Sequence, residues 1–179
     1  MKYIGFKILL FITIVITLHI SCSNEDSKLT DNDYVYFKEP LEGANKILVE
    51  KDRIRIEKYG ERRNWNLKES GTGLFYEIYY KGDGDTAQKG DIATINCEVS
   101  LLDGTKCYSS DTLGPNIFLI GRGQVETGLE EGILMMQVGD KAHFIMPPFL
   151  AYGLIGDEYK IPPLSIVVYD VELLELAKE

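Results

Sequence analysis

The chain has 179 residues, of which 45% are hydrophobic, and a formal net charge of −9. This hydrophobic share excludes an intrinsically disordered chain, and the acidic balance argues against nucleic acid or anionic lipid as the main partner. Three cysteines and two histidines occur without a Cys-x-x-Cys or His-x-x-x-His pair, so we expect no metal site and no cofactor.

The first segment has the pattern of an export signal. Lys2 and Lys7 precede the apolar run Ile8–Leu18, which is too short to span a bilayer and is typical of a secretory signal peptide. Together with Cys22 and the polar residues after it, residues 1–21 resemble a bacterial lipoprotein signal. The resemblance implies that Cys22 is lipidated and holds the chain on a cell-envelope membrane, with the outer membrane favoured and a periplasmic or surface face. The alternative is ordinary cleavage nearby, with Cys22 incidental.

A polar stretch, residues 22–45, is interpreted as a tether, and residues 46–70 as a helical extension. Asn45 is a suitable N-cap residue, and the predicted helix ends at Arg63. Four arginines make this the most basic part of an acidic chain. A solvated helix face is the favoured interpretation, and docking to an envelope protein partner is the alternative. We expect Trp65 to pack onto the domain that follows.

Residues 72–177 are rich in strand patterns. Leu74–Tyr80 has strong β propensity, and Ile92–Leu102 alternates between apolar and polar residues as a half-buried strand does. Between these strands, residues 81–85 are interpreted as a turn, in preference to a calcium loop, because no glutamate follows at the required spacing.

The dipeptide Asp103-Gly104 predicts a hairpin. If Asp103-Gly104 forms a two-residue turn, the numbers of two directly paired residues add up to 207. The numbers of Cys97 and Cys107 add up to 204, so these cysteines are not direct partners unless a bulge shifts the register. A disulfide between them therefore remains open, and export would permit one.

The centre of the chain carries a short helical pattern. Val125, Leu129, Ile133 and Met136 share one helical face after the strand-like run 117–120. Further strands are predicted from Asp140 to Met146 and from Ser165 to Leu176. A lone helix must bury its apolar stripe against the sheet. The predicted fold is therefore α+β, with a curved antiparallel sheet wrapped around one short helix and a partly helical N-terminal extension.

No nucleophile–base pair stands out. His143 lies in a predicted strand, where a packed or exposed histidine is favoured over a catalytic one. The Gly121–Gly123 turn is too short for a phosphate-binding loop. The loop from 149 to 163 carries many apolar and aromatic residues, which is typical of a pocket wall. An apolar pocket without acid–base groups favours a binding function, or catalysis by conformational selection.

The order of several motifs resembles the FKBP-type peptidyl-prolyl isomerases. The resemblance covers about residues 72–177 and rests on Leu-Leu-Asp-Gly-Thr, Ser109-Ser110, Phe118-Leu-Ile-Gly121, Val125-Glu-Thr-Gly-Leu-Glu-Glu-Gly132, Met136-Gln-Val-Gly-Asp140, Ala151-Tyr-Gly153, Ile161-Pro-Pro163 and Val168-Tyr-Asp-Val-Glu-Leu173. With the lipoprotein-like signal, the chain also resembles FKBP-like lipoproteins of the Bacteroidetes type, including the gliding-motility-associated group. The resemblance implies cis/trans isomerisation of X-Pro bonds in proline-containing polypeptides.

The resemblance also implies a pocket. Its functional residues are Val125 and Glu126, the latter through its backbone N–H, together with Tyr152, which offers its hydroxyl, and Ile161 and Tyr169 in the far wall. Phe118 adds an edge and Leu129 forms the floor.

This sequence departs from the family pattern at five pocket positions. The floor tryptophan is Leu129, two aromatic positions are Cys97 and Cys107, the family's aspartate is Tyr108, and a further aromatic is Asn116. The resemblance therefore implies a wider, less aromatic pocket. Three functions follow: a prolyl isomerase that assists folding of envelope proteins, with activity reduced by these changes; a catalytically weak or inactive peptide-binding module in a secretion or motility assembly; and a binder of macrolide-type ligands.

Overall fold

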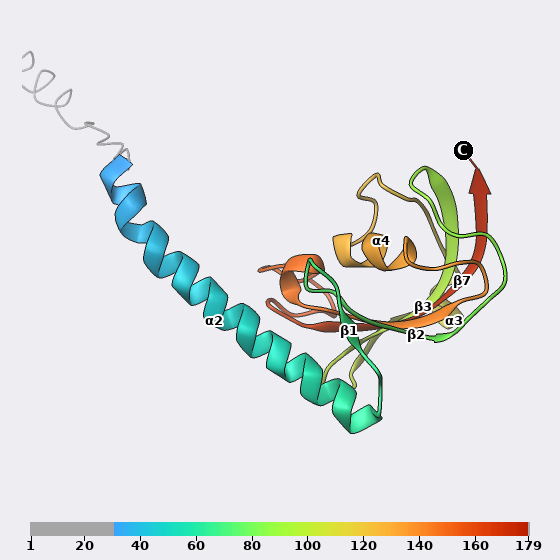
Figure 1. The fold of residues 1–179 in the computed structure, drawn as a ribbon, viewed down its shortest axis with the longest axis horizontal. Coiled ribbons are helices and arrows are strands. Elements are labelled where there is room, and N and C mark those ends of the chain that lie inside the picture. The colour runs from blue at the N-terminus through green and yellow to red at the C-terminus, as the bar shows by residue number, and fades with distance from the viewer. Residues whose placement is uncertain (1–30, 179) are drawn as a thin grey trace, which may run out of the picture. The chain divides into compact units, whose positions relative to one another are not determined.

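The computed structural model describes residues 31–178, in two units that meet between Gly43 and Ala44. The second unit contains a curved antiparallel sheet with helix α4 (Thr127–Ile133) on its concave side (Figure 1). The predicted α+β fold is thereby confirmed. The signal segment 1–21, Cys22 and the first part of the predicted tether lie outside the described residues.

The remaining elements are helix α2 (Asp31–Arg63), strands β1 (Lys68–Glu69), β2 (Phe75–Tyr80), β3 (Asp91–Leu101) and β4 (Lys106–Ser109), the single-turn helix α3 (Ser110–Leu113), strand β5 (Asn116–Leu119), strand β6 (Lys141–Met146), the 3₁₀ turn η1 (Pro148–Leu150) and strand β7 (Val167–Lys178). The sheet order is β1-β2-β6-β7-β3-β4, and β5 pairs with β3. Strand β7 is central because it pairs with β3 along its whole length and with β6 on its other side.

The concave face of the sheet holds the main core. The inward side chains of β7, from Val167 to Leu173, are at most 3% exposed, as the alternation predicted. Leu129 and Ile133 of α4 are fully buried in the same cluster, together with Met136 beyond the end of the helix. The helix is shorter than the predicted stripe, because Val125 and Met136 lie outside it, and Leu129 and Ile133 make the contact between the helix and the sheet.

Two glycines allow α4 to lie directly on the sheet. A Cβ atom at Gly132 would come within 2.6 Å of the Phe144 ring, and one at Gly128 within 2.6 Å of the Met146 sulfur. Real Cβ atoms do not approach neighbours so closely, because this distance lies well inside van der Waals contact. Small residues at both positions are therefore required for this helix-to-sheet separation.

The hairpin between β3 and β4 has the predicted register near its centre, where Val99 pairs with Tyr108. A bulge between Val99 and Ser100 adjusts the register toward the turn. Cys97 and Cys107 are both free thiols. The hairpin therefore forms without a disulfide.

The convex face of the sheet is covered by the end of α2. Ile56 and Tyr59 are buried against Phe75, Ile145 and Val168, side chains that alternate with those of the main core. Trp65 packs at the edge of this second cluster, as predicted. Strands β2, β6 and β7 are therefore buried on both faces, a feature that a simple alternating pattern does not reveal.

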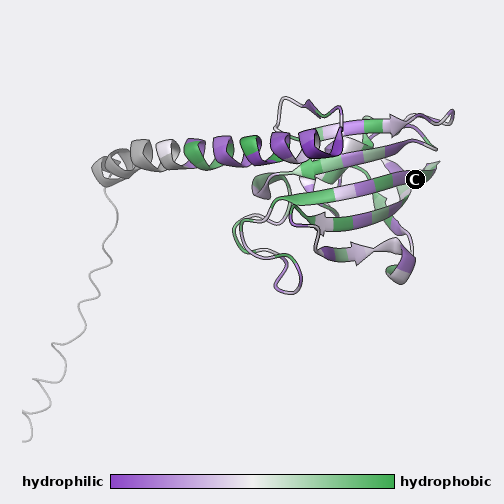
Figure 2. Cartoon of the chain, turned by 90° about the horizontal axis from the view of Figure 1, so that it is seen from below, coloured by the Kyte–Doolittle hydropathy of each residue, from purple (hydrophilic) through white to green (hydrophobic). Residues whose placement is uncertain are grey.

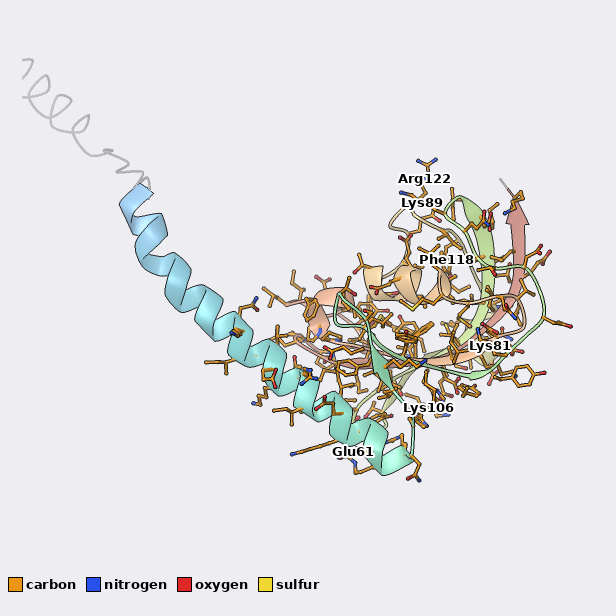
Figure 3. All side chains as sticks on the ribbon, in the orientation of Figure 1. Glu61, Lys81, Lys89, Lys106, Phe118 and Arg122 are labelled. Carbon is orange, nitrogen blue, oxygen red and sulfur yellow. The ribbon has the colours of Figure 1, made fainter. Side chains whose placement is uncertain are left out.

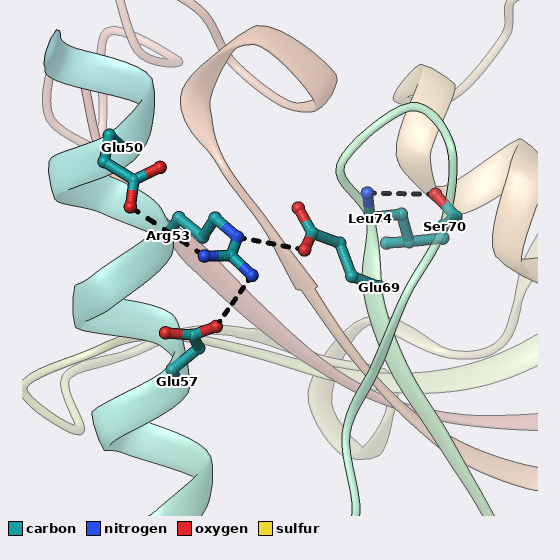
Figure 4. Close-up of polar contacts among 6 residues, drawn as sticks. All are labelled: Glu50, Arg53, Glu57, Glu69, Ser70 and Leu74. Atoms are coloured by element: carbon teal, nitrogen blue, oxygen red, sulfur yellow. Dashed lines mark hydrogen bonds and ion pairs between the residues drawn. The ribbon is translucent and has the colours of Figure 1, made fainter. Parts of the chain in front are cut away.

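A network of charges accompanies this apolar contact. Arg53 on α2 contacts Glu69 of β1 at 3.0 Å, and it also reaches Glu57 at 3.0 Å and Glu50 at 3.8 Å (Figure 4). These side chains are solvent-exposed, so screening by water limits what each pair contributes to stability. The network orients α2 relative to β1, and the buried apolar residues supply most of the stabilisation.

The start of α2 differs from the sequence prediction. The helix begins at Asp31, so Asn45 lies inside it and the prediction that Asn45 caps it is wrong. Pro40 and Gly43 discourage helix, which favoured a later start, whereas Asp31 and Asp33 are acids suited to a first turn.

The end of α2 matches the prediction. The N–H groups of Asn64 and Trp65 donate to the carbonyls of Glu61 and Gly60, and Asn64 has a φ of 57°. This is a Schellman-type C-cap. The last part of the predicted extension 46–70 adds a strand that was not expected, because residues 68–69 pair with β2 as strand β1.

None of the helices in the described part of the chain combines the length and apolar character that crossing a bilayer requires.

His143 lies on the convex face of the sheet, beside the second cluster. Its ring stacks between Trp65, at 3.7 Å between centroids, and Tyr79, at 4.3 Å. Its Nδ1 atom is buried without a hydrogen-bond partner and lies 3.7 Å from Asp170 Oδ1. Burial lowers the pKa of His143, although the charges of Asp170 and Glu77 oppose the shift. The structure therefore favours a packed role for this residue.

We expect folding stability to fall as the pH is lowered from 7 through the ordinary pKa range of histidine. The unfolded chain binds a proton in that range, whereas the folded chain binds it only below the lowered pKa of His143, so protonation favours unfolding. Denaturant unfolding at several pH values measures the effect. His143→Phe keeps an aromatic ring in the stack and should flatten the pH dependence. Equal slopes for both proteins would contradict this role of His143.

Candidate functional site

A cavity of about 380 Å³ opens between the β3–β4 hairpin, the loop before α4 and the loop after η1. Its lining residues are Cys97, Val99, Tyr108, Ser109, Ser110, Leu113, Gly114, Pro115, Asn116, Gln124, Val125, Glu126, Tyr152 and Tyr169. They come from five separate stretches of the chain, so the site exists only in the folded chain.

The sheet side of the cavity is one row of residues across neighbouring strands. Tyr108 of β4 pairs with Val99 of β3, and Val99 pairs with Tyr169 of β7. Residues directly opposite in antiparallel strands point to the same face. The antiparallel register thus places both tyrosines on the concave side.

A single carboxylate shapes the loop that leads to Val125 and Glu126. The Glu130 side chain accepts hydrogen bonds from the backbone N–H groups of residues 121, 122 and 123, at 3.0–3.2 Å. Gly121 and Gly123 have positive φ values of 87° and 63°, which glycine adopts without strain. The Gly121–Gly123 turn therefore holds the protein's own carboxylate, in agreement with the expectation that it is no phosphate loop. Arg122 projects outward from this turn (Figure 3).

The rim of the cavity beside the hairpin is held by two serines. Ser109 caps α3 by accepting a hydrogen bond from the Asp111 N–H. Ser110 accepts one from the Cys97 N–H at 3.0 Å, which ties α3 to β3. This rim therefore has a fixed position relative to the sheet.

Polar groups meet at the base of the cavity. The hydroxyls of Tyr152 and Tyr169 lie 3.0 Å apart. Burial raises the pKa of both phenols. A hydrogen bond with the Glu126 carboxylate raises that of Tyr152 further, and the negative charge of Glu126 raises that of Tyr169. Burial also raises the pKa of the Cys97 thiol, with a smaller contribution from Glu126. Both hydroxyls are therefore protonated at neutral pH, and because one of them donates to the other, one proton of the pair remains for a further acceptor.

Tyr108 is engaged with the loop after η1. Its hydroxyl donates to the Asp157 carboxylate, which also accepts the N–H groups of Tyr159, Lys160 and Ile161 at 2.8–2.9 Å. Partial burial of Asp157 opposes its ionisation, but these hydrogen bonds outweigh burial and lower its pKa to about 2. The same hydrogen bond raises the pKa of Tyr108 to about 12. The tyrosine that replaces the family's aspartate thus anchors this loop to the hairpin.

Seven of the eleven residues predicted for the pocket line the cavity: Val125, Glu126, Tyr152, Tyr169, Cys97, Tyr108 and Asn116. The other four, Phe118, Leu129, Ile161 and Cys107, do not line it, which corrects the expectation that they form its edge, floor and wall. They are 0–3% exposed because they pack among core neighbours (Figure 3 labels Phe118). They support the lining residues from behind.

Sequence reasoning missed much of the rim. Gln124 and the segment from Ser109 to Pro115 line the cavity but were not predicted as site residues. The Ser109-Ser110 pair and the Gly114-Pro115 turn were the available signals, because such residues commonly form caps and turns beside sites.

Within residues 31–178, no group of three or more His, Cys, Asp and Glu side chains is placed to hold a metal ion. The chemistry that the cavity offers consists of apolar contact and neutral hydrogen-bond donors beside one carboxylate, that of Glu126.

We expect Glu130→Ala to lower the free energy of unfolding by about 1–3 kcal/mol, because three backbone N–H groups lose their acceptor. Denaturant unfolding measures this change. Amide hydrogen exchange at residues 121–123 should also accelerate. Glu175→Ala removes an exposed carboxylate of β7 and serves as the control. Equal effects of the two substitutions would show that Glu130 does not hold the loop.

The comparisons with known proteins agree on one family. A model of the FKBP-type peptidyl-prolyl cis-trans isomerases matches residues 84–174. FkpA of Aeromonas hydrophila, an FKBP-type peptidyl-prolyl cis-trans isomerase, is 32% identical over 165 residues, which cover 86% of this chain and 60% of FkpA. Human FKBP9 is 41% identical over 91 residues, or 50% of this chain and 16% of FKBP9. The chain thus spans less than two thirds of either relative.

Solved structures show the same similarity. The crystal structure of FkpA from Escherichia coli has a TM-score of 0.60 and 28% identity, and the similarity covers 96% of this chain and 82% of FkpA. The structure of AtFKBP13 has a TM-score of 0.60 and 33% identity, covering 63% of this chain and 99% of AtFKBP13. The matched range 84–174 contains every residue that lines the cavity. The chain therefore belongs to the family of FKBP-type peptidyl-prolyl cis-trans isomerases.

Proposed function

We propose that this chain is a peptidyl-prolyl cis-trans isomerase that acts on polypeptides of the cell envelope. The observation that carries the proposal is the cavity between hairpin and loops, which joins apolar walls to the Tyr152 hydroxyl within the range matched by the family. The cavity volume of about 380 Å³ falls within the range of small-molecule pockets, which suits a proline ring and its flanking peptide groups.

The reaction requires no covalent step. Amide resonance sets a barrier of about 18–20 kcal/mol to rotation about a peptide bond, and uncatalysed X-Pro exchange takes tens to hundreds of seconds. A pocket that excludes water favours the twisted imide, whose charge separation is smaller, over the planar polar imide. Val99, Val125 and the tyrosine rings supply such surroundings on the cavity wall.

Two donors are placed to hold the substrate carbonyls. When Tyr169 donates to the oxygen of Tyr152, the Tyr152 proton points toward the Glu126 carboxylate, its hydrogen-bond partner, and a substrate carbonyl in the cavity competes with this carboxylate for the proton. The backbone N–H of Glu126 donates to no other group in the described part of the chain, because Glu126 is the N-cap residue of α4 and the first N–H groups of a helix lack internal partners. Both donors keep their positions without a substrate.

We expect Tyr152→Phe to lower the rate of catalysed exchange about two- to tenfold, the loss of one neutral hydrogen bond. Exchange spectroscopy by NMR on a Leu-Pro peptide, with the purified chain at micromolar concentration, measures the rate. Tyr80→Phe alters an exposed tyrosine of β2, outside the cavity, and is the matched control. A wild-type rate equal to the uncatalysed rate would refute the enzyme.

The proposed location rests on the N-terminal sequence. The basic start, the apolar run Ile8–Leu18 and Cys22 support export followed by lipidation, with the chain anchored to the outer membrane on a periplasmic or surface face. They also support its placement among envelope FKBP-like lipoproteins of the Bacteroidetes type. Its clients would then be exported proteins that fold outside the cytoplasm.

Expression of the full chain in a Gram-negative host tests the anchor. We expect the protein in the membrane fraction, with an N-terminal peptide that starts at Cys22 and carries the mass of acyl chains. Cys22→Ser should release the protein from the membrane, whereas Ser23→Ala should leave it there. An unmodified Cys22 peptide in the wild type would show ordinary cleavage instead.

A peptide-binding module without substantial catalysis is the second candidate. Tyr108 occupies the position of the family's aspartate, and its hydroxyl donates a hydrogen bond to Asp157. It therefore does not polarise a substrate carbonyl as a free carboxyl group would. Exposed apolar residues of α2, including Ile47 and Leu48, would suit a protein partner in an envelope assembly. Figure 2 shows hydrophobic bands along this helix. Saturable binding of the Leu-Pro peptide without accelerated exchange would favour this candidate.

A further inference from the structure

The cavity contains one charged side chain. Of its fourteen lining residues, Glu126 alone carries a formal charge, and none is basic. The hydroxyls of Tyr152 and Tyr169 and the thiol of Cys97 all experience the Glu126 charge, which helps to raise the pKa of each group. Because Glu126 lines the cavity and hydrogen-bonds with Tyr152, its carboxylate belongs to the polar group at the base of the cavity.

Glu126 has no ionic partner within residues 31–178. Although it occupies the N-cap position of α4, its side chain makes no capping hydrogen bond. It is half-buried. A carboxylate in a partly dehydrated site loses solvation, and a cation that approaches it restores a favourable interaction.

The surroundings add to the negative potential. Asp157 lies beside the cavity and also raises the pKa of Tyr152, and Asp111 lies in α3 on the rim. Lys160 is a basic residue on the Tyr108 side, where its ammonium is 5.1 Å from the Tyr108 ring centroid and donates to the Cys107 carbonyl. Lys160 keeps its positive charge, but it does not line the cavity and forms no ion pair with Glu126.

We propose that the Glu126 carboxylate makes the site selective for X-Pro segments that carry a lysine or arginine directly beside the proline. This inference rests on the proposed isomerase function and adds its substrate class. The proline ring would occupy the apolar part of the cavity, and the long flexible side chain of a neighbouring basic residue would reach the carboxylate. The backbone N–H of Glu126 binds peptide carbonyls independently of the side chain.

The test compares peptides that differ only in charge. One series carries lysine directly before proline and a second carries it directly after, each beside a matched peptide with Nε-acetyl-lysine, which has similar length and no charge. NMR exchange spectroscopy with the purified full chain measures each catalysed rate. For the wild type we expect lysine to be favoured over acetyl-lysine about two- to fivefold in at least one series, which corresponds to one partly exposed ion pair. Higher salt should reduce this ratio.

Two substitutions distinguish a local site from the net charge of the protein. Glu126→Gln should bring the lysine to acetyl-lysine ratio close to one, whatever its effect on the absolute rates. Glu175→Gln removes the same charge from an exposed position on β7 and should leave the ratio unchanged. If both variants lower the ratio equally, long-range charge causes the preference and the inference is wrong.

Failure of the inference can be separated from failure of the proposed function. Acceleration of the acetyl-lysine peptides with a ratio of one in the wild type would retain the isomerase and overturn the selectivity. No acceleration of any peptide would overturn both.

Discussion

The close contact between α4 and the sheet is the constraint on which the rest of the domain depends. Gly128 and Gly132 leave no space for a Cβ atom against Met146 and Phe144. At this separation, the apolar stripe of the helix fills the concave side of the sheet. Val125 and Glu126, directly before α4, and Tyr169 of β7 then line the same cavity. A bulkier residue at either position would shift the helix and the site together.

Two carboxylates shape the loops around the cavity in the same way, each by accepting several backbone hydrogen bonds. Glu130 gathers three backbone N–H groups before α4, and Asp157 gathers three in the loop after η1. Each charge is stabilised by several donors at once, so irregular backbone is held without regular secondary structure. The cavity thus has firm walls although loops supply much of it. Glu126 has no such set of backbone donors: its carboxylate interacts with the Tyr152 hydroxyl and lines the cavity, where it can also meet a ligand.

The sheet joins this site to the N-terminal extension through its other face. Side chains that alternate with the main core in β2, β6 and β7 pack against Ile56 and Tyr59 of α2. His143 lies on this convex face, stacked between Trp65 and Tyr79, and its strand neighbour Phe144 lies under α4 on the concave face. Changes in packing at the extension therefore act on the strands that carry Tyr169 and the main core.

The sequence by itself determined the α+β class, the strands and their inward faces, the helix stripe at Leu129 and Ile133, the register near Val99, and seven of the cavity residues. Local periodicity and turn chemistry encode these features, and the family motifs identify the positions. Only the tertiary structure decided that Phe118, Leu129, Ile161 and Cys107 lie behind the cavity, that Tyr108 bonds to Asp157, and that α2 covers the outer face. Each of these depends on which side chains meet across segments far apart in the chain. A pattern confined to one segment does not contain that information, because packing distance and shared hydrogen bonds arise only when the segments come together.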